Sequence, residues 1–303
     1  MIKAPVLAVL LATLGFHVSA VAGPPEFQWL NQFAGLPETS LRNVAPTASG
    51  FVGSTGTRTL PIKWRAPDGS IECHVLIRYD NGRWSTTGNV GATGTNNDLC
   101  DFFGGSIPVK AITPFRNATC IGGDFQNMGP DSLRHFACYT EAGGWQQING
   151  PGNGPNGSVE ALAFDGTYVY VGGSFTEVDV ATGTPLSARR IVRTAGLSWD
   201  QLTTDGAGTS DGVNGTVSAI LPTSSFVYAG VSRSVRQWNP SANEKWKDLG
   251  SSNNGTVRDI EINNTLIAAV ASNSTTWGGR AAGSVSEYNP GSMEWSAVGS
   301  SSG

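Results

Sequence analysis

The chain has 303 residues, a length that allows one large all-β domain or two average domains. Glycine accounts for 40 residues and charged residues for only 14% of the chain, against a usual charged share of about 25%, so we expect many short strands joined by tight turns. The net charge of −4 excludes the basic surface with which proteins bind nucleic acids or anionic membranes.

Residues 1–22 have the pattern of a secretory signal peptide. Lys3 supplies a positive start, Ala4–Phe16 is uncharged and mostly apolar, and Ala20–Ala22 is a small-x-small cleavage site. The apolar run is shorter than the ~20 residues that a membrane-spanning helix needs. We therefore predict a cleaved signal and no membrane span, and a mature protein that is secreted, whether extracellular, periplasmic or on the cell surface.

An apolar tetrad recurs along the chain at intervals of 40 to 58 residues. Three of the four copies directly follow an Asn-Gly turn with one further residue, as at Asn156-Gly157, Asn214-Gly215 and Asn254-Gly255. Because Asn-Gly readily takes the positive φ of tight turns, each tetrad is predicted to begin a strand. The tetrads are Val109–Ile112, Val159–Leu162, Val217–Ile220 and Val257–Ile260.

Two further blocks follow each tetrad in a fixed order. A glycine pair or its degenerate form comes about ten residues later, as in Gly122-Gly123 and Gly172-Gly173. A strand, a turn and a tryptophan come next, and we expect these tryptophans to pack between the repeats. The repeating tryptophans are Trp84, Trp145, Trp199, Trp246 and Trp295.

These blocks predict four short strands in every repeat, which is the period of a β-propeller. In the third repeat we expect strands near 159–164, 168–173, 189–194 and 199–202. The fold class is thus all-β, a β-propeller of four-stranded antiparallel blades in a domain spanning 23–303, and the alternative is a β-sandwich. The expected blades lie near 41–90, 109–148, 159–202, 217–249 and 257–298.

The order of tetrad, glycine pair, aromatic strand and tryptophan resembles the kelch-type and galactose-oxidase-like β-propeller repeats of bacterial secreted and surface proteins. The resemblance is best at Val169–Phe175 and Asn214–Ile220; it covers about 109–300 well and 41–90 loosely, and the glycine pair is lost in the fourth and fifth repeats. It implies architecture only, because such propellers include enzymes, adhesins and scaffolds.

The two ends of the repeat region bear on the number of blades. Residues 295–303 copy the segment that begins at Trp246 and then stop, and Phe27–Leu36 resembles the fourth strand of a blade. We expect about five complete blades, with a sixth at least partly missing from an original six or seven. The alternative is a five-bladed ring with Trp29 packed on its outside.

The four cysteines, Cys73, Cys100, Cys120 and Cys138, are predicted to be structural disulfides. Export places them where disulfides persist, and the chain has no CxxC pair that would suggest a metal site. Cys120 ends one expected strand and Cys138 lies on the next, so antiparallel pairing would join them. Cys73 and Cys100 would then form the second pair.

The sequence predicts no catalytic residue, metal site or cofactor. His74 and His135 lie in or beside expected strands, and no G-x-S-x-G elbow accompanies them. The oxygen-rich loops Asn96–Asp98 and Asp205–Asp211 are interpreted as solvated loops rather than calcium sites. No pair of carboxylates suited to glycosidase chemistry stands out among Asp124, Glu141, Glu160, Asp165 and Asp200.

Two functions are consistent with this reading. The first is a secreted, non-catalytic recognition or surface-scaffold module whose partner is an extracellular protein or a glycan; its ligand-binding residues are not identified by the sequence. The second is a secreted carbohydrate-active enzyme, a glycosidase or lyase, with loop carboxylates at one mouth of the propeller. The absence of a catalytic constellation favours the first.

Overall fold

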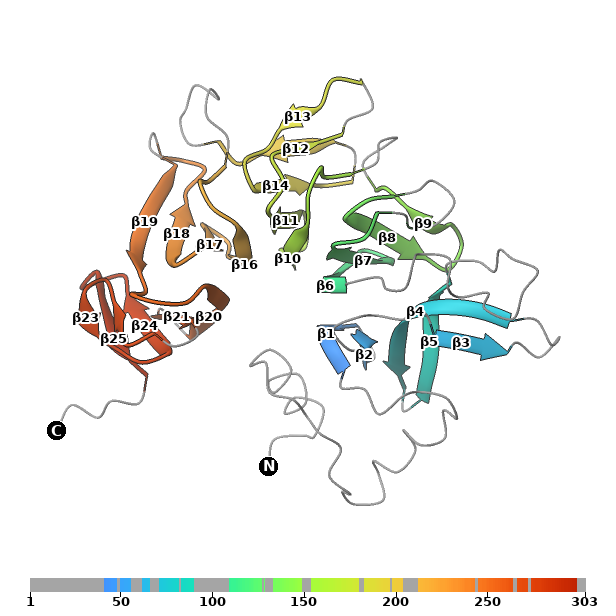
Figure 1. Ribbon diagram of the computed structural model, residues 1–303, viewed down its shortest axis with the longest axis horizontal. Coiled ribbons are helices and arrows are strands. Elements are labelled where there is room, and N and C mark those ends of the chain that lie inside the picture. The colour runs from blue at the N-terminus through green and yellow to red at the C-terminus, as the bar shows by residue number, and fades with distance from the viewer. Residues whose placement is uncertain are drawn as a thin grey trace, which may run out of the picture. The chain divides into compact units, whose positions relative to one another are not determined.

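The computed structural model shows regular structure that is entirely β within the residues it describes: 41–47, 50–55, 62–65, 71–81, 83–89, 109–126, 128, 133–148, 154–179, 183–196, 198–203, 212–242, 245–263, 266–271 and 274–298 (Figure 1). Within these ranges no helix is long and apolar enough to cross a membrane. The chain divides into two compact units, residues 1–148 and 149–303, which are described separately.

The first unit contains two antiparallel sheets, here called blade one and blade two. Blade two has the order β6-β7-β8-β9, whereas blade one has the order β1-β2-β4-β3 with β5 also paired to β4. The strands of blade one are β1 (Leu41–Pro46), β2 (Gly50–Thr55), β3 (Ile62–Arg65), β4 (Ile71–Asp80) and β5 (Arg83–Asn89), and those of blade two are β6 (Val109–Phe115), β7 (Ala118–Gly123), β8 (Phe136–Thr140) and β9 (Gly144–Gln146).

Blade one therefore has one strand more than the sequence predicts. The reason is the length of β4, which at 10 residues is about twice an ordinary strand. Its second half pairs with β2 along one edge and with β5 along the other. Its first half pairs with β3, and His74 marks the change because it is in register with both Ile62 and Asn89.

The second unit contains three four-stranded sheets, blades three to five, and each is an antiparallel meander in chain order. The strands of the third repeat agree with those expected, and the fold class is confirmed as all-β and built of four-stranded propeller blades. The number of blades and the domain bounds stay predictions, and residues 1–22 lie outside the described ranges. The strands are β10 (Val159–Phe164), β11 (Val169–Gly173), β14 (Ile191–Thr194) and β15 (Trp199–Gln201) in blade three, β16 (Val217–Pro222), β17 (Val227–Val231), β18 (Ser234–Trp238) and β19 (Trp246–Ser251) in blade four, and β20 (Val257–Asn263), β21 (Leu266–Ala271), β24 (Val285–Asn289) and β25 (Glu294–Ala297) in blade five.

Blades two to five each have a register shift at the same place in the first strand, immediately after the first residue of the repeated tetrad, and in blade one a shift follows Arg42, the second residue of β1. In blade four it separates Val217 from Ala219, and the residue between them is Ser218. The hydroxyl of Ser218 donates a hydrogen bond to the carbonyl of Val257, the first residue of blade five, at 2.5 Å. Such a bulge redirects one side chain out of the alternating pattern, and here that side chain links two blades.

The first glycine of the repeated pair provides space for the next blade. A Cβ on Gly172 would lie 2.5 Å from Cγ1 of Val217, and a Cβ on Gly230 would lie 2.7 Å from Cγ1 of Val257. Both distances are too short for real carbon contacts. The glycine is therefore retained in blade four, where only the second member of the pair has been replaced, by Val231.

Three of the repeating tryptophans, Trp145, Trp246 and Trp295, pack between successive blades of one unit, as expected. Trp145, Trp199 and Trp295 are buried. The indole of Trp246 donates to the carbonyl of Leu202 at 3.1 Å, and a Cβ on Gly88 of blade one would lie 2.9 Å from the indole of Trp145 in blade two. The side chain of Trp84 lies outside the described residues.

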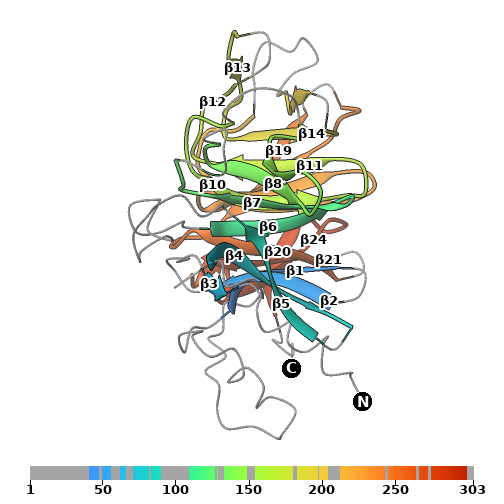
Figure 2. The ribbon, with the colours of Figure 1, turned by 90° about the vertical axis from the view of Figure 1, so that its right-hand side faces the viewer.

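Two short ribbons that the sequence analysis does not predict lie between the second and third strands of their blades. They are β12 (Glu177–Val178) with β13 (Leu186–Ser187), and β22 (Thr276–Trp277) with β23 (Arg280–Ala281). Figure 1 and Figure 2 both show the β12–β13 ribbon on the side of β14 that faces away from β11. The side-chain carbonyl of Asn156 anchors it by accepting from the amides of Thr176 and Glu177 at 2.9 and 3.2 Å.

Candidate functional site

The predicted pair Cys120 and Cys138 is joined by a disulfide in blade two. The two residues are register partners in β7 and β8, and both are fully buried. Cys100 and the side chain of Cys73 lie outside the described residues, so their pairing stays a prediction.

His135 lies among polar groups of blade two. Its ring is buried and lies 3.2 Å from the carbonyl of Gly123 and 3.2 Å from the side-chain nitrogen of Gln126. Burial lowers the pKa of His135, although the Gly123 carbonyl and Asp124 oppose this. The ring is thus neutral and held between two polar partners, and in the described structure no serine, threonine or cysteine is bonded to it. This environment is typical of a histidine that packs in a sheet.

The acidic residues named by the sequence are dispersed. The described residues contain no group of three or more His, Cys, Asp or Glu that could hold a metal ion, and the loops Asn96–Asp98 and Asp205–Asp211 lie outside them. Each of the five carboxylates has a local partner: Asp124 with His135, Glu141 with Thr87, Glu160 with Ser158, Asp165 with Tyr170, and Asp200 with Arg193.

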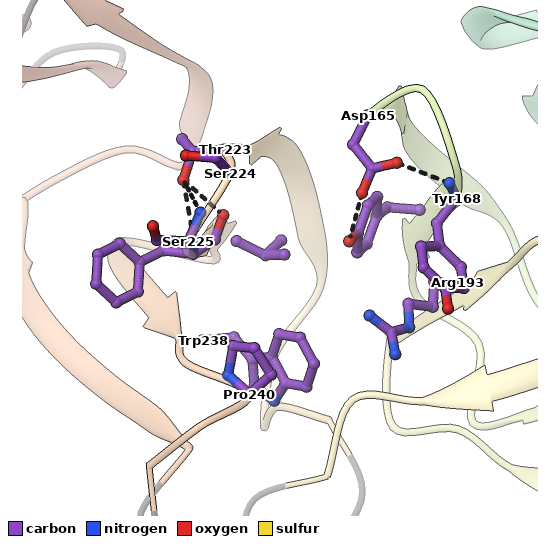
Figure 3. A pocket seen from close by; sticks show the side chains of 11 residues that line it. Asp165, Tyr168, Arg193, Thr223, Ser224, Ser225, Trp238 and Pro240 are labelled. Atoms are coloured by element: carbon purple, nitrogen blue, oxygen red, sulfur yellow. Dashed lines mark hydrogen bonds between the residues drawn. The ribbon is translucent and has the colours of Figure 1, made fainter.

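A cleft of about 180 Å³ lies between blade three and blade four of the second unit. Figure 3 shows Asp165, Tyr168 and Arg193 on one side of it and Thr223, Ser224 and Ser225 on the other, with Trp238 and Pro240 between the two sides. Tyr170, Phe226 and Val227 complete the lining.

Two equivalent hairpin turns form the opposite walls of the cleft. In the β10–β11 turn, Oδ1 of Asp165 accepts hydrogen bonds from the amides of Thr167 and Tyr168, both at 2.7 Å. In the β16–β17 turn, Oγ1 of Thr223 accepts from the amide of Phe226 at 3.0 Å. Short polar side chains that bond to the backbone in this way fix the turns, so both walls are preorganised.

Arg193 is held among aromatic rings in the cleft. Its guanidinium carbon lies 4.1 Å from the ring centroid of Tyr168 and 5.4 Å from that of Trp238, and its Nε lies 3.7 Å from Oδ2 of Asp200. Cation–π contacts of this kind orient the planar guanidinium and leave its edge for hydrogen bonding.

Tyr170, which is buried, and Asp165, which is exposed, form a polar pair in the lining of the cleft. The Tyr170 hydroxyl donates to Oδ2 of Asp165 at 3.0 Å. Burial raises the pKa of Tyr170 to about 12, and the negative charge of Asp165 adds to the effect. The phenol therefore stays protonated, and both oxygens of Asp165 are already engaged by the protein itself.

The lining can bind a ligand but has no nucleophile paired with a base. The groups that face a ligand are the guanidinium of Arg193, which also hydrogen-bonds the Tyr170 hydroxyl, the exposed hydroxyls of Ser224 and Ser225, and the edges of the aromatic rings. Donors beside aromatic surface suit a small polar ligand that carries oxygen acceptors.

This cleft is not predicted from the sequence, although Asp165 is among the acidic residues considered there. One sequence signal could have found part of it: Tyr170 and Arg193 are in direct register across two adjacent strands. The opposite wall comes from the next blade, 58 residues later at the Thr223 position, and no local pattern connects the two.

Comparisons with known proteins yield no family. No family model matches the chain, and no curated protein matches it. Resemblance to kelch-type repeats in particular therefore stays a prediction.

Some solved structures are similar to the chain at low identity. The computationally designed Ika8 protein is 14% identical with a TM-score of 0.40 over 84% of this chain and 73% of that one, and the designed Ika4 protein is 14% identical with a TM-score of 0.37 over 60% of this chain and 90% of that one. The extracellular domain of BT4673 from B. thetaiotaomicron is 10% identical with a TM-score of 0.46 over 85% of this chain, and the chain spans only 33% of its length.

Proposed function

We propose that this protein is a secreted, non-catalytic recognition module that binds an extracellular glycan in the cleft between blades three and four. The observation that carries the proposal is the guanidinium of Arg193, fixed against Tyr168 and near Trp238 at a cleft whose other wall presents exposed serine hydroxyls. The signal-peptide pattern of residues 1–22 and the disulfide between Cys120 and Cys138 support a location outside the cytoplasm.

The chemistry of the lining favours a sugar over an apolar ligand. Sugars carry clustered oxygen acceptors and also apolar C–H surface, which match hydrogen-bond donors and aromatic edges respectively. The cleft volume of about 180 Å³ is below the roughly 300 Å³ of pockets that enclose drug-sized molecules. A single sugar unit at a chain end or branch therefore suits it better than an extended oligosaccharide.

The decisive experiment is a glycan array with the secreted chain, compared with the variants Arg193→Ala and Arg236→Ala. Arg236 is a matched control because it also lies on the third strand of its blade and pairs with an aspartate, Asp248, at 3.6 Å, but it does not line the cleft. We expect a defined set of glycans to bind, with binding lost in the first variant only. Equal loss in both variants, or no bound glycan at all, would reject this function.

The alternative of a glycosidase or lyase is tested on the same sample. Incubating the bound glycans with the protein and measuring new reducing ends or unsaturated products distinguishes the two functions. Turnover would replace the recognition proposal with the enzymatic one.

A further inference from the structure

Three Asn-Gly turns of the second unit differ in how their asparagine side chains are held. In such a pair the backbone nitrogen of the glycine can attack Cγ of the asparagine side chain, and glycine has no Cβ to obstruct the approach. All three asparagines are exposed, so exposure alone predicts equal reactivity, whereas their hydrogen bonds predict a difference. The pairs are Asn156-Gly157, Asn214-Gly215 and Asn254-Gly255.

The side chain of Asn156 is tied to the β12–β13 ribbon at both of its polar atoms. Its Oδ1 accepts hydrogen bonds from the amides of Thr176 and Glu177 at 2.9 and 3.2 Å. Its Nδ2 donates to Oγ1 of Thr176 at 3.1 Å and lies 3.5 Å from Oε2 of Glu177. Because these bonds point Oδ1 and Nδ2 at the ribbon, Cγ cannot turn toward the nitrogen of Gly157 until they break.

The side chain of Asn254 has the opposite arrangement. Its Oδ1 accepts a hydrogen bond from the amide of Gly255 at 3.0 Å, so the side chain is folded back over the peptide that would attack it. Cγ, which carries Oδ1, therefore lies beside the nitrogen of Gly255. Within the described residues Nδ2 of Asn254 makes no hydrogen bond, so nothing there retains the nitrogen that has to leave. The hydroxyl of Ser252 holds only the two carbonyls of this turn, at 2.9 and 3.2 Å.

Asn254 is released because its neighbour anchors the ribbon of blade five. Oδ1 of Asn253 accepts from the amides of Thr275 and Thr276 at 3.0 and 3.1 Å, and Nδ2 of Asn253 donates to Oγ1 of Thr275 at 2.9 Å. The anchor is thus the residue before the Asn-Gly pair, whereas in blade three it is part of the pair. Blade four has no such ribbon in the part of the chain that the structure describes, and there the side chain of Asn214 makes no hydrogen bond.

We propose that Asn254 is a modification site at which the chain deamidates through a succinimide, and that the β12–β13 ribbon protects Asn156 from the same reaction. The nitrogen of Gly255 forms a bond to Cγ of Asn254, the bond from Cγ to Nδ2 breaks, and ammonia leaves with the proton of the Gly255 amide. Solvent water then opens the imide ring at one of its two carbonyls and leaves aspartate or isoaspartate. Either product adds a negative charge to the turn before β20. The reaction does not depend on the proposed glycan binding.

The test incubates the secreted chain at pH 8 and follows each Asn-Gly pair by peptide mass spectrometry, with fragmentation to locate the converted residue. In the folded protein we expect Asn254 and Asn214 to convert about tenfold faster than Asn156 or more, since one or two net hydrogen bonds add roughly that factor to a barrier. In guanidinium chloride all three should convert at similar rates, because the ribbon is then absent. Equal rates of Asn254 and Asn156 in the folded protein, or a difference that persists after unfolding, would overturn the proposal.

Two matched variants test the protective role of the ribbon. Thr176→Ala removes the hydroxyl that accepts from Nδ2 of Asn156, so Asn156 should convert several-fold faster in this variant. Thr275→Ala is the control, because it removes the equivalent acceptor of Asn253 from the other ribbon and should leave the rate at Asn156 unchanged. Acceleration of Asn156 in both variants would indicate general loosening of the fold, and acceleration in neither would mean that the bond to Thr176 is not protective. Either result would overturn the role assigned to the ribbon.

Discussion

The indole nitrogen of Trp295 in blade five donates a hydrogen bond of 2.7 Å to the backbone carbonyl of Leu249 in blade four. Trp246 makes the equivalent bond to Leu202, one blade earlier. Trp295 also stacks on Trp277 of the β22–β23 ribbon, with ring centroids 4.6 Å apart. One side chain thus connects the fourth strands of two blades and the ribbon of its own blade.

Replacing Trp295 with Phe should lower the free energy of unfolding by about 2 kcal/mol. The phenylalanine ring would keep part of the packing of the indole, but the buried carbonyl of Leu249 would lose the N–H donor of Trp295. Chemical denaturation followed by circular dichroism measures the change. Trp145→Phe is the control, because the indole nitrogen of Trp145 is buried with no hydrogen-bond partner in the described structure. Equal losses would mean that the bond to Leu249 contributes nothing.

Gly172→Ala should destabilise the second unit by roughly 1–3 kcal/mol, because its methyl group would overlap Val217 and Ile220. The double variant Gly172→Ala/Val217→Ala should lose less than the sum of the two single variants, because removal of the Val217 methyl groups relieves part of the overlap. In Gly283→Ala the new methyl group meets nothing nearer than 3.7 Å, so that variant should unfold at the wild-type temperature. Thermal melts compare the four variants, and losses that simply add in the double variant would contradict the steric explanation.

Removing the disulfide with Cys120→Ser and Cys138→Ser should cost about 3 kcal/mol. The estimate follows from the loop that the bond closes, with a sequence separation of 18 residues. Urea unfolding of the double variant should show a lower midpoint than that of the oxidised wild type. Reduction of the wild type should lower the midpoint further, because it also breaks the predicted Cys73–Cys100 bond. Peptide mapping without reduction should also link Cys73 to Cys100, and a peptide that links Cys100 to Cys120 would refute the predicted pairing.

Asp259→Asn should stabilise the protein at pH 7.5 by about 1 kcal/mol, after allowance for solvent screening. Burial raises the pKa of Asp259 from 3.8 to about 6, and Glu261 adds to the shift by repulsion. An acid whose pKa is higher in the folded state binds more protons there, so stability falls as pH rises from about 4 to about 6.

The difference between wild type and Asp259→Asn should therefore shrink toward zero below pH 4 and level off above pH 6. Unfolding free energies across this range test the expectation. Asp248→Asn is the comparison, because it loses the ion pair with Arg236 and should not be stabilised at pH 7.5. A constant difference between wild type and Asp259→Asn at all pH values would show that ionisation of Asp259 is not the cause.

The strands and the disulfide could be predicted because their signals are local. Alternating apolar residues and turn dipeptides fix strands over a few positions, and Cys120 faces Cys138 as a direct result of one hairpin register. The five-stranded form of blade one escaped prediction, because only the observed pairing shows that β4 has different partners along its two halves.

The Asn-Gly turns show a finer limit of local reasoning. Positive φ is present at Gly215 and Gly255, at 142° and 76°, as the turn chemistry predicts. Gly157 does not have it, and a Cβ there would lie 3.1 Å from the backbone of Phe175. The glycine of this dipeptide thus allows a positive φ in two turns, whereas in the third its lack of a side chain allows close packing.

The cleft could not be predicted from local patterns, because its two walls belong to different blades.

The tryptophan bonds have a direction along the chain. Each acceptor carbonyl precedes its donor indole, Leu202 by 44 residues and Leu249 by 46. During synthesis the acceptor strand has therefore already left the ribosome when its tryptophan emerges. Blades four and five can therefore each pack on a preceding blade that has already been synthesised, and we expect the second unit to assemble from its amino-terminal side.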